Sequence, residues 1–181
     1  YLKRVNRHIL FVRKKYFVMF DDLESEKPAK FTWIYHVLEN TLQLDANNAS
    51  FSYRSGNVPV SVVHITRPEE LEVADLTGDR AQSDPITGEN FDARRDPHHR
   101  AHALWVSNKT LKSKFHFMTV IYPIKPGMGN PTITRLDDYT AEVVNGDEHD
   151  VISFDPKTSY PATLLVDVPA IVEGAQHPST F

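Results

Sequence analysis

The sequence predicts an all-β protein, an antiparallel β-sandwich of two stacked sheets. Short apolar segments recur along the chain at the spacing of sandwich strands, and clusters of Gly, Pro, Asn and Asp separate them. The sequence shows no long amphipathic helix pattern. The chain has 181 residues, of which 40% are hydrophobic and 24% are charged, a composition typical of a folded globular unit. We therefore expect residues 1–181 to form a single domain.

The first three predicted strands form a hairpin and a following strand. Residues 5–12 and 16–20 are rich in β-branched and aromatic side chains and flank the basic turn Arg13-Lys14-Lys15. The second arm is apolar on both faces, which is typical of a strand buried inside a sandwich. Residues 24–28 are expected to form a turn before the third strand, 31–38. The aromatic residues of that strand alternate and share one face: Phe31, Trp33 and Tyr35.

Further strands follow the same pattern. Their predicted ranges are 41–44, 49–54, 58–65, 71–76, 102–106, 114–122, 132–136, 141–144, 149–154 and 162–168. A long loop around residues 77–100 has almost no periodic apolar signal. A connection of this length is uncommon in a compact domain and usually has a functional role or is mobile. The tail at 173–181 is expected to be frayed.

The charge of the chain is weakly acidic overall and strongly segregated. A formal net charge of -4 and a pI near 6.1 argue against a general nucleic-acid binder, because such domains are basic. The longest apolar run, 16–20, is far too short to span a membrane. Residues 1–20 carry Lys and Arg without an acid, and residues 137–155 carry Asp and Glu without Lys or Arg. The basic strands either meet an acidic polysaccharide or neighbouring domain, or form a solvated face.

Metal and cofactor chemistry finds little support in the sequence. The chain has no cysteine, which excludes a disulfide scaffold, a thiolate zinc site and a cysteine nucleophile. The densest histidine cluster is His98, His99 and His102. Neutral imidazole is a common metal ligand, but adjacent side chains on an extended segment point apart. We therefore predict neither a metal nor a cofactor, and the sequence has no phosphate-binding glycine loop.

Two histidines in predicted strands are candidates for acid–base chemistry. His36 and His64 lie among apolar neighbours, and each could act as an acid or base if Asp21 or Asp22 oriented it. The alternative, which we favour, is that both are hydrogen-bonded, half-buried histidines. The two acids would then close a turn at the end of a strand by accepting backbone N–H bonds. No catalytic residue is assigned on this basis, and the substrate-binding residues stay unknown.

The opening of the chain carries a family resemblance. Its residues read Val5-x-Arg7-x-Ile9-Leu10-Phe11-Val12, then Tyr16-Phe17-Val18-Met19-Phe20-Asp21-Asp22-Leu23, then Phe31-Thr32-Trp33-Ile34-Tyr35-His36. This pattern resembles the C-terminal β-sandwich region of the heparinase II/III-like polysaccharide lyases. Weaker echoes are residues 60–65 and 117–123. The resemblance covers residues 1–65 and the strand at 117–123.

The resemblance implies a specific chemistry for the parent protein. Such lyases pair an N-terminal α/α toroid with antiparallel β-sheet domains. They cleave uronic-acid-containing polysaccharides by removing the C5 proton and eliminating the 4-linked sugar. The family's acid, base and charge-neutralising residues come from the toroid and the early β segment, and some members hold a metal at a His/Asp/His site there. Those motifs are missing here. Only Asp21, Asp22 and His36 match, and the match implies a place in the sandwich rather than a catalytic role.

The resemblance therefore implies an accessory domain of a polysaccharide lyase. The chain opens at Tyr1 within a predicted strand, and we expect it to be the C-terminal fragment of a longer, multidomain protein. Its partner would be the N-terminal toroid of the same parent chain, and contact with an acidic polysaccharide is possible. The parent would be periplasmic or secreted. This hypothesis predicts an exposed apolar docking patch and no activity of the fragment alone, because elimination needs all its groups in one cleft.

A non-catalytic carbohydrate-binding module is the alternative. In that case exposed aromatic side chains would stack on sugar rings, and the candidates are Trp33, Tyr35, Trp105 and Tyr122. Aromatic residues of strands are more often part of the core. The two hypotheses therefore differ in which side chains are exposed: an apolar docking patch or an aromatic platform.

Overall fold

A computed structural model describes residues 1–37, 41–77, 102–157 and 162–166. These residues form thirteen strands and one short 3-10 helix, Pro68–Glu70. The strands are β1 (Leu2–Val12), β2 (Tyr16–Ala29), β3 (Thr32–Val37), β4 (Gln43–Asp45), β5 (Ser50–Ser55), β6 (Val58–His64), β7 (Leu71–Thr77), β8 (His102–Asn108), β9 (Lys112–Pro123), β10 (Thr132–Arg135), β11 (Thr140–Asn145), β12 (Glu148–Phe154) and β13 (Ala162–Val166). In the described part of the chain, no helix is long and apolar enough to cross a membrane.

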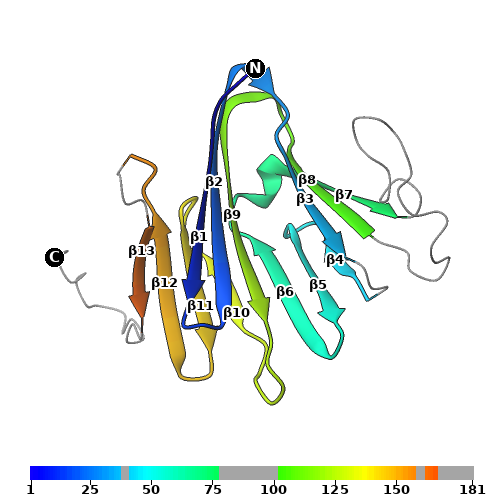
Figure 1. Ribbon diagram of the computed structural model, residues 1–181, viewed down its shortest axis with the longest axis vertical. Coiled ribbons are helices and arrows are strands. Elements are labelled where there is room, and N and C mark those ends of the chain that lie inside the picture. Colours follow the sequence, from blue (N-terminus) through cyan, green and yellow to red (C-terminus); the bar gives the residue numbers. More distant parts are fainter. Residues whose placement is uncertain (38–40, 78–101, 158–161, 167–181) are drawn as a thin grey trace.

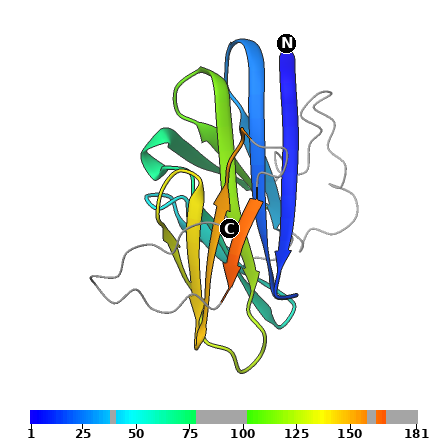
Figure 2. The ribbon, with the colours of Figure 1, turned by 90° about the vertical axis from the view of Figure 1, so that its left-hand side faces the viewer.

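The strands form three antiparallel sheets (Figure 1). The largest has six strands in the order β1-β2-β9-β6-β5-β4, the second has the order β10-β11-β12-β13, and the third has the order β3-β8-β7. Figure 2 is turned by 90° and brings the four-stranded sheet to the front. The all-β, antiparallel sandwich predicted from the sequence is confirmed. The structure adds a third sheet to the two that were expected.

The six-stranded sheet has a separate hydrophobic cluster on each face. Successive side chains of a strand point to opposite faces, and β9 supplies both clusters through this alternation. Met118, Val120 and Tyr122 pack with the four-stranded sheet, and Phe115 and Phe117 pack with the three-stranded sheet. The six-stranded sheet is therefore the middle layer, and burial of both its faces contributes most of the core.

Local turn chemistry explains the hairpins. Arg13 and Lys14 have positive φ angles of 50° and 55° in the turn between β1 and β2, the left-handed geometry that tight hairpins require. Gly56 (φ 57°) occupies the corresponding position between β5 and β6. Asp45 accepts hydrogen bonds from Asn48, which close the turn before β5 and lower the pKa of the Asp45 carboxyl. The predicted turns at these three places are confirmed.

Strand β2 differs from the sequence-based expectation in two ways. It continues through residues 24–28, predicted as a turn, because Leu2 of β1 pairs with Ser25. A register shift against β9 lies in this stretch, and such an irregularity accommodates Pro28, which has no N–H to donate. In addition, its two faces are buried to different degrees: Tyr16, Val18 and Phe20 are in the core on one face, whereas on the other Met19 is partly buried and Phe17 is exposed.

Candidate functional site

The two acids that the sequence placed at a turn lie in the middle of β2. Asp21, only 5% exposed, accepts hydrogen bonds from Nε and Nη2 of Arg7 at 2.6 and 2.7 Å. Asp22 binds Arg4, with Nε–Oδ2 at 2.7 Å. Hydrogen bonding to these carboxylates raises the pKa of both arginines. The turn-closing interpretation is wrong, because the strand continues past both acids and each carboxylate binds a side chain of β1.

The two candidate histidines lie in different environments. His64 is 2% exposed, its Nδ1 lies 2.9 Å from Oγ1 of Thr119, and its ring meets that of Trp33 edge-on. Burial lowers the pKa of His64 to about 3, so the imidazole is neutral near pH 7. His36 is exposed on the outer face of β3. The structure therefore does not bring them together, and His64 is a core histidine without access to substrate.

The histidine cluster of the long loop lies mostly outside the described residues. Its members His98 and His99 belong to residues 78–101, and for His102 only the backbone is described. Among the described residues, no three His, Cys, Asp or Glu side chains are placed to hold a metal ion. The absence of a metal at this loop stays a prediction.

The candidate aromatic platform is largely buried. Trp33 and Tyr122 are core residues, and Tyr35 stacks on Trp33 and meets Phe51 edge-on. These three rings are unavailable to a sugar. Trp105 is half-buried on the central strand of the three-stranded sheet, where it pairs with positions 34 and 74. Its strand neighbours at 104 and 106 are buried, so Trp105 points away from the core.

The two segments of opposite charge meet in the structure. Asp150, buried on β12, accepts hydrogen bonds from Arg13 at 2.9 and 3.0 Å and from the Tyr16 hydroxyl at 2.8 Å. Lys15 forms an ion pair with Glu148. Desolvation, followed by the bond to Asp150, raises the pKa of Tyr16. Most of the basic side chains of the first strands are therefore engaged within the protein rather than free for an acidic polysaccharide.

One ionic cluster has no signal in the sequence. The Asp138 carboxylate accepts a hydrogen bond from Nε of Arg67 at 2.7 Å and one from Arg135, and these bonds lower its pKa. Nε2 of His116 lies 3.0 Å from the backbone oxygen of Asp138, and the His116 ring stacks on Tyr139. The residues of this cluster come from distant parts of the chain, so only the folded structure could show that they meet. The cluster joins the six-stranded sheet to the loop before β11.

An apolar patch lies on the outer part of β1 and β2. It consists of Val5, Ile9, Phe11 and Phe17, which are 58, 60, 52 and 37% exposed. The Phe11 and Phe17 rings stack at 4.5 Å between centroids. These side chains share one face of the sheet by alternation and register. We call this surface the β1–β2 patch.

The β1–β2 patch is the extension of a buried face. Phe17 pairs with Ile121 of β9, which packs against the core under the three-stranded sheet. That sheet covers the face over β9 and β6 but leaves β1 open. The Arg7–Asp21 ion pair lies within the patch. Arg7 is directly opposite Asp21 in the register of β1 and β2, and it lies between Val5 and Ile9 on the same face of β1. The patch is thus a mostly apolar surface that contains one ion pair, Arg7–Asp21.

Three solved structures, one of a heparan sulfate lyase and two of heparinase III, are similar to this chain in fold. The first is the heparan sulfate lyase HepC from Pedobacter heparinus, in a mutant form. It has a TM-score of 0.58 and 14% identity, and the match covers 82% of this chain. Two heparinase III structures, one of them the BT4657 gene product, have TM-scores of 0.52 with 14 and 16% identity, and each match covers 90% of this chain. This chain shares the fold of one part of heparinase III.

The part that matches this chain is only a fraction of each of those proteins. In all three, the matched part is 23% of the solved chain, so this chain spans about a quarter of their length. No family model matches the sequence, and no curated protein matches it. The resemblance to heparinase-like lyases, stated from three sequence segments, is confirmed at the level of the fold.

Proposed function

We propose that the chain is the accessory C-terminal β-sandwich domain of a polysaccharide lyase. The parent protein would cleave uronic-acid-containing polysaccharides by β-elimination, in the periplasm or outside the cell. This domain would pack against a catalytic α/α toroid and supply no catalytic group of its own. The heparinase III fold supports the parentage, because the solved lyases contain this β-rich part as about a quarter of their chains.

The β1–β2 patch is the observation that carries the accessory role. Monomeric proteins rarely leave contiguous apolar surface of this kind uncovered, and such patches commonly mark protein–protein contacts. Four large apolar side chains lie together in this patch, and the two charged residues among them, Arg7 and Asp21, are paired with each other. The occupant that we propose is the remaining three quarters of the parent lyase. The sequence-based hypothesis predicted a patch of this type for a domain that docks onto a toroid.

The described side chains also agree with a non-catalytic role. The acids Asp21 and Asp22 are bound to arginines, and His64 is buried and neutral. β-Elimination needs a base, an acid and a group that neutralises the carboxylate, all held in one cleft. None of the sequence-derived candidates that the structure describes is free and grouped in this way. We therefore assign the chemistry to the rest of the parent chain.

The test compares this fragment with its full-length parent. Each is incubated with heparin-like, chondroitin-like and alginate-like polymers, and the ultraviolet absorbance of the newly formed unsaturated uronate is followed. We expect a signal from the parent alone, and the polymer that produces it identifies the substrate class. A signal from the isolated fragment would contradict the accessory role, and a parent inactive on every uronate polymer would contradict the lyase assignment.

A carbohydrate-binding module remains the second candidate, and Trp105 is the observation that favours it. This side chain points away from the core, at the centre of the outer face of β3, β8 and β7, and aromatic faces are common platforms for sugar rings. The hypothesis predicts that the fragment binds neutral as well as acidic glycans. It differs from the accessory role in needing no second domain.

A further inference from the structure

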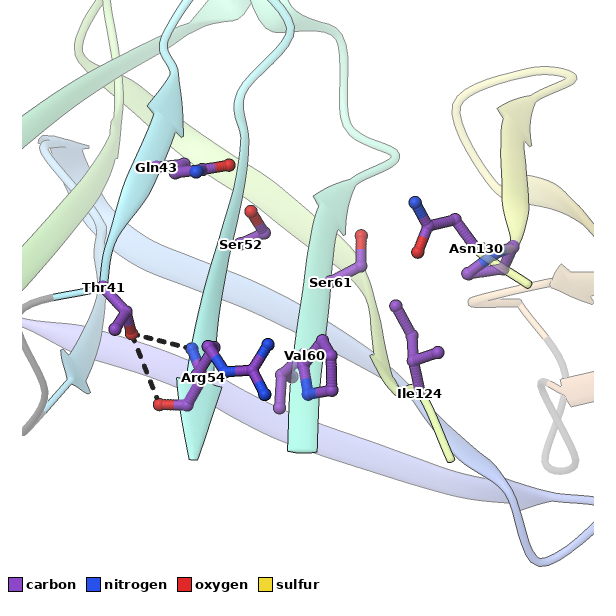
Figure 3. A pocket seen from close by; sticks show the side chains of 10 residues that line it. Thr41, Gln43, Ser52, Arg54, Val60, Ser61, Ile124 and Asn130 are labelled. Atoms are coloured by element: carbon purple, nitrogen blue, oxygen red, sulfur yellow. Dashed lines mark hydrogen bonds between the residues drawn. The ribbon is translucent and has the colours of Figure 1, made fainter. Parts of the chain in front are cut away.

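A polar groove lies between two of the sheets. Its floor is the face of β4, β5 and β6 that the four-stranded sheet leaves open, and one wall is the segment just before β10, at Asn130 and Pro131 (Figure 3). The groove has a volume of about 660 Å³, which is in the range of small-molecule binding sites, roughly 300–1,000 Å³. It lies on the opposite face of the six-stranded sheet from the β1–β2 patch, and near the other edge.

Hydroxyl and amide groups line the groove in a regular row. Gln43, Ser52 and Ser61 are in register across β4, β5 and β6, so their side chains share one face. Neighbouring strands are about 4.8 Å apart, and the row therefore presents donors and acceptors across the width of a sugar ring or more. Figure 3 shows Asn130 next to Ser61 and the apolar Ile124 below them. Together these side chains match the alternation of hydroxyls and C–H surface on a saccharide.

Arg54 supplies the positive charge of the groove. The described residues that line the groove include no Asp or Glu. Among the described residues, every other arginine has a carboxylate within 4 Å, and Arg54 has none. Within the described part of the chain, its side chain makes one hydrogen bond, from Nη2 to the backbone oxygen of Asn57 at 3.1 Å. A guanidinium has five N–H donors, so most of them remain for a ligand.

The backbone around Arg54 is held in place by the fold. The Arg54 N–H donates to Oγ1 of Thr41 at 2.8 Å, which ties β5 to the segment before β4. On the other side, the turn at Gly56 presents the Asn57 oxygen that Nη2 contacts. Figure 3 shows the Arg54 side chain extending along the floor toward β6. Arg54 is exposed to solvent, and its guanidinium lies along the floor of the groove, where a ligand can reach it.

We propose that this groove binds an anionic sugar unit, with its carboxylate or sulfate held by Arg54 and its hydroxyls by Ser52, Ser61, Gln43 and Asn130. A planar guanidinium binds a carboxylate or sulfate through paired hydrogen bonds. The choice of a sugar as the ligand rests on the proposed function, whereas the preference for an anion rests on Arg54, which has no carboxylate partner among the described residues. Because the lining residues that the structure describes include no aromatic ring, the groove selects its ligand by charge and hydrogen bonds.

The test is a titration of the ¹⁵N-labelled 181-residue chain with three tetrasaccharides followed by NMR. One alternates glucuronate and N-acetylglucosamine, the second is its sulfated form, and the third is the neutral chitin tetrasaccharide. We expect the acidic sugars to shift the amide signals of residues 52–54, 61 and 130, and the neutral one to leave them in place. Binding of the sulfated form alone would assign the anion as sulfate, and binding of both acidic forms would assign the carboxylate.

Substitution separates the role of Arg54 from general attraction to a cation. We expect Arg54→Gln to weaken binding at least tenfold and Arg54→Lys to retain part of it. Lys109→Gln is the matched control, since it removes one exposed charge outside the groove, and should change affinity less than twofold. Near-ultraviolet circular dichroism verifies that each variant is folded.

The proposal is overturned if the shifts map to another surface, or if neutral and acidic sugars bind alike. It is also overturned if the Arg54→Gln variant binds as tightly as the unsubstituted 181-residue chain. These outcomes are independent of the lyase assay. An active parent with a non-binding groove would overturn this inference alone, whereas sugar binding at the groove with an inactive parent would overturn the proposed function alone.

Discussion

At the scale of single residues, burial decides what each titratable group can do. His64 and His36 have the same chemistry and similar strand contexts in the sequence, yet one lies in the core and the other faces solvent. The buried one keeps a single polar contact, to Thr119, and its Nε2 has no partner. Charging such a ring would cost the folded state heavily. The histidine is therefore a source of pH-dependent stability rather than of catalysis.

The pH dependence of stability provides a test at this scale. Burial holds the pKa of His64 at about 3 in the folded state, against 6.5 as the ordinary value. As the pH falls below about 6.5, only the unfolded chain binds this proton. The free energy of unfolding should therefore fall by about 1.4 kcal/mol per pH unit toward pH 4 on account of His64. In His64→Gln, urea unfolding at several pH values should show this part of the slope removed.

The exposed His36 supplies the matched control for that experiment. His36→Gln makes the same chemical change on a side chain that stays in contact with solvent. The free energy of unfolding of His36→Gln should equal that of the unsubstituted 181-residue chain across the pH range. If the free energy of unfolding of His64→Gln fell with pH as steeply as that of the unsubstituted chain, another group would be responsible for the loss of stability in acid.

At the scale of strands and turns, most of the structure follows from local pattern. The alternation in residues 31–37 places Phe31 and Trp33 in the core and Ile34 outside it, as the sequence indicates. The turns at Asp45 and Gly56 are likewise local, because one side chain or one φ angle determines them. The exception is β2 after residue 23. Its polar sequence looks like a turn, but pairing with β1 keeps it extended.

The turn at Gly56 can be tested by a single methyl group. Gly56 has φ 57°, and no atom lies within 4 Å of the position that a Cβ would take. Gly56→Ala should therefore cost about 1 kcal/mol from backbone strain alone, measured by urea denaturation. The control is Gly129→Ala, where space is equally open and no positive φ is present, and its stability should be nearly unchanged. Equal stability of both variants would contradict the backbone argument.

At the scale of the whole molecule, two surfaces are open to a partner or a ligand: the β1–β2 patch and the groove at Arg54. The three-stranded sheet covers one part of a long apolar face and leaves the β1–β2 patch open. On the opposite face, the groove at Arg54 lies between the six-stranded sheet and β10. The two surfaces lie on opposite faces of the central sheet. A partner domain seated on the patch would therefore leave the groove accessible.

The role of the β1–β2 patch can be tested in the full-length parent. Ile9→Glu places a charge at the centre of the patch, and we expect the parent to lose lyase activity and to unfold in two transitions instead of one. In the isolated chain the same change should alter stability little, since Ile9 is already 60% exposed. Calorimetry and the unsaturated-uronate assay provide the measurements.

Leu111→Glu is the control for the patch experiment. Leu111 is 64% exposed, outside the patch, in the turn before β9. It should leave both activity and the unfolding profile of the parent unchanged. Unchanged behaviour of Ile9→Glu as well would contradict docking through the patch.

The sequence by itself determined the fold class, the number and approximate position of the strands, and a resemblance that the structure confirms as a fold. All three depend on period-two alternation and turn residues, which are properties of short segments. Only the tertiary structure decided that the sandwich has a third sheet, that Asp21 binds Arg7 and that Arg13 binds Asp150. It also decided that Arg54 has no carboxylate partner among the residues that the structure describes. The physical reason is that alternation gives a strand an apolar face but does not specify what covers it. Which charges meet, and which surfaces stay open, depends on segments brought together from distant parts of the chain.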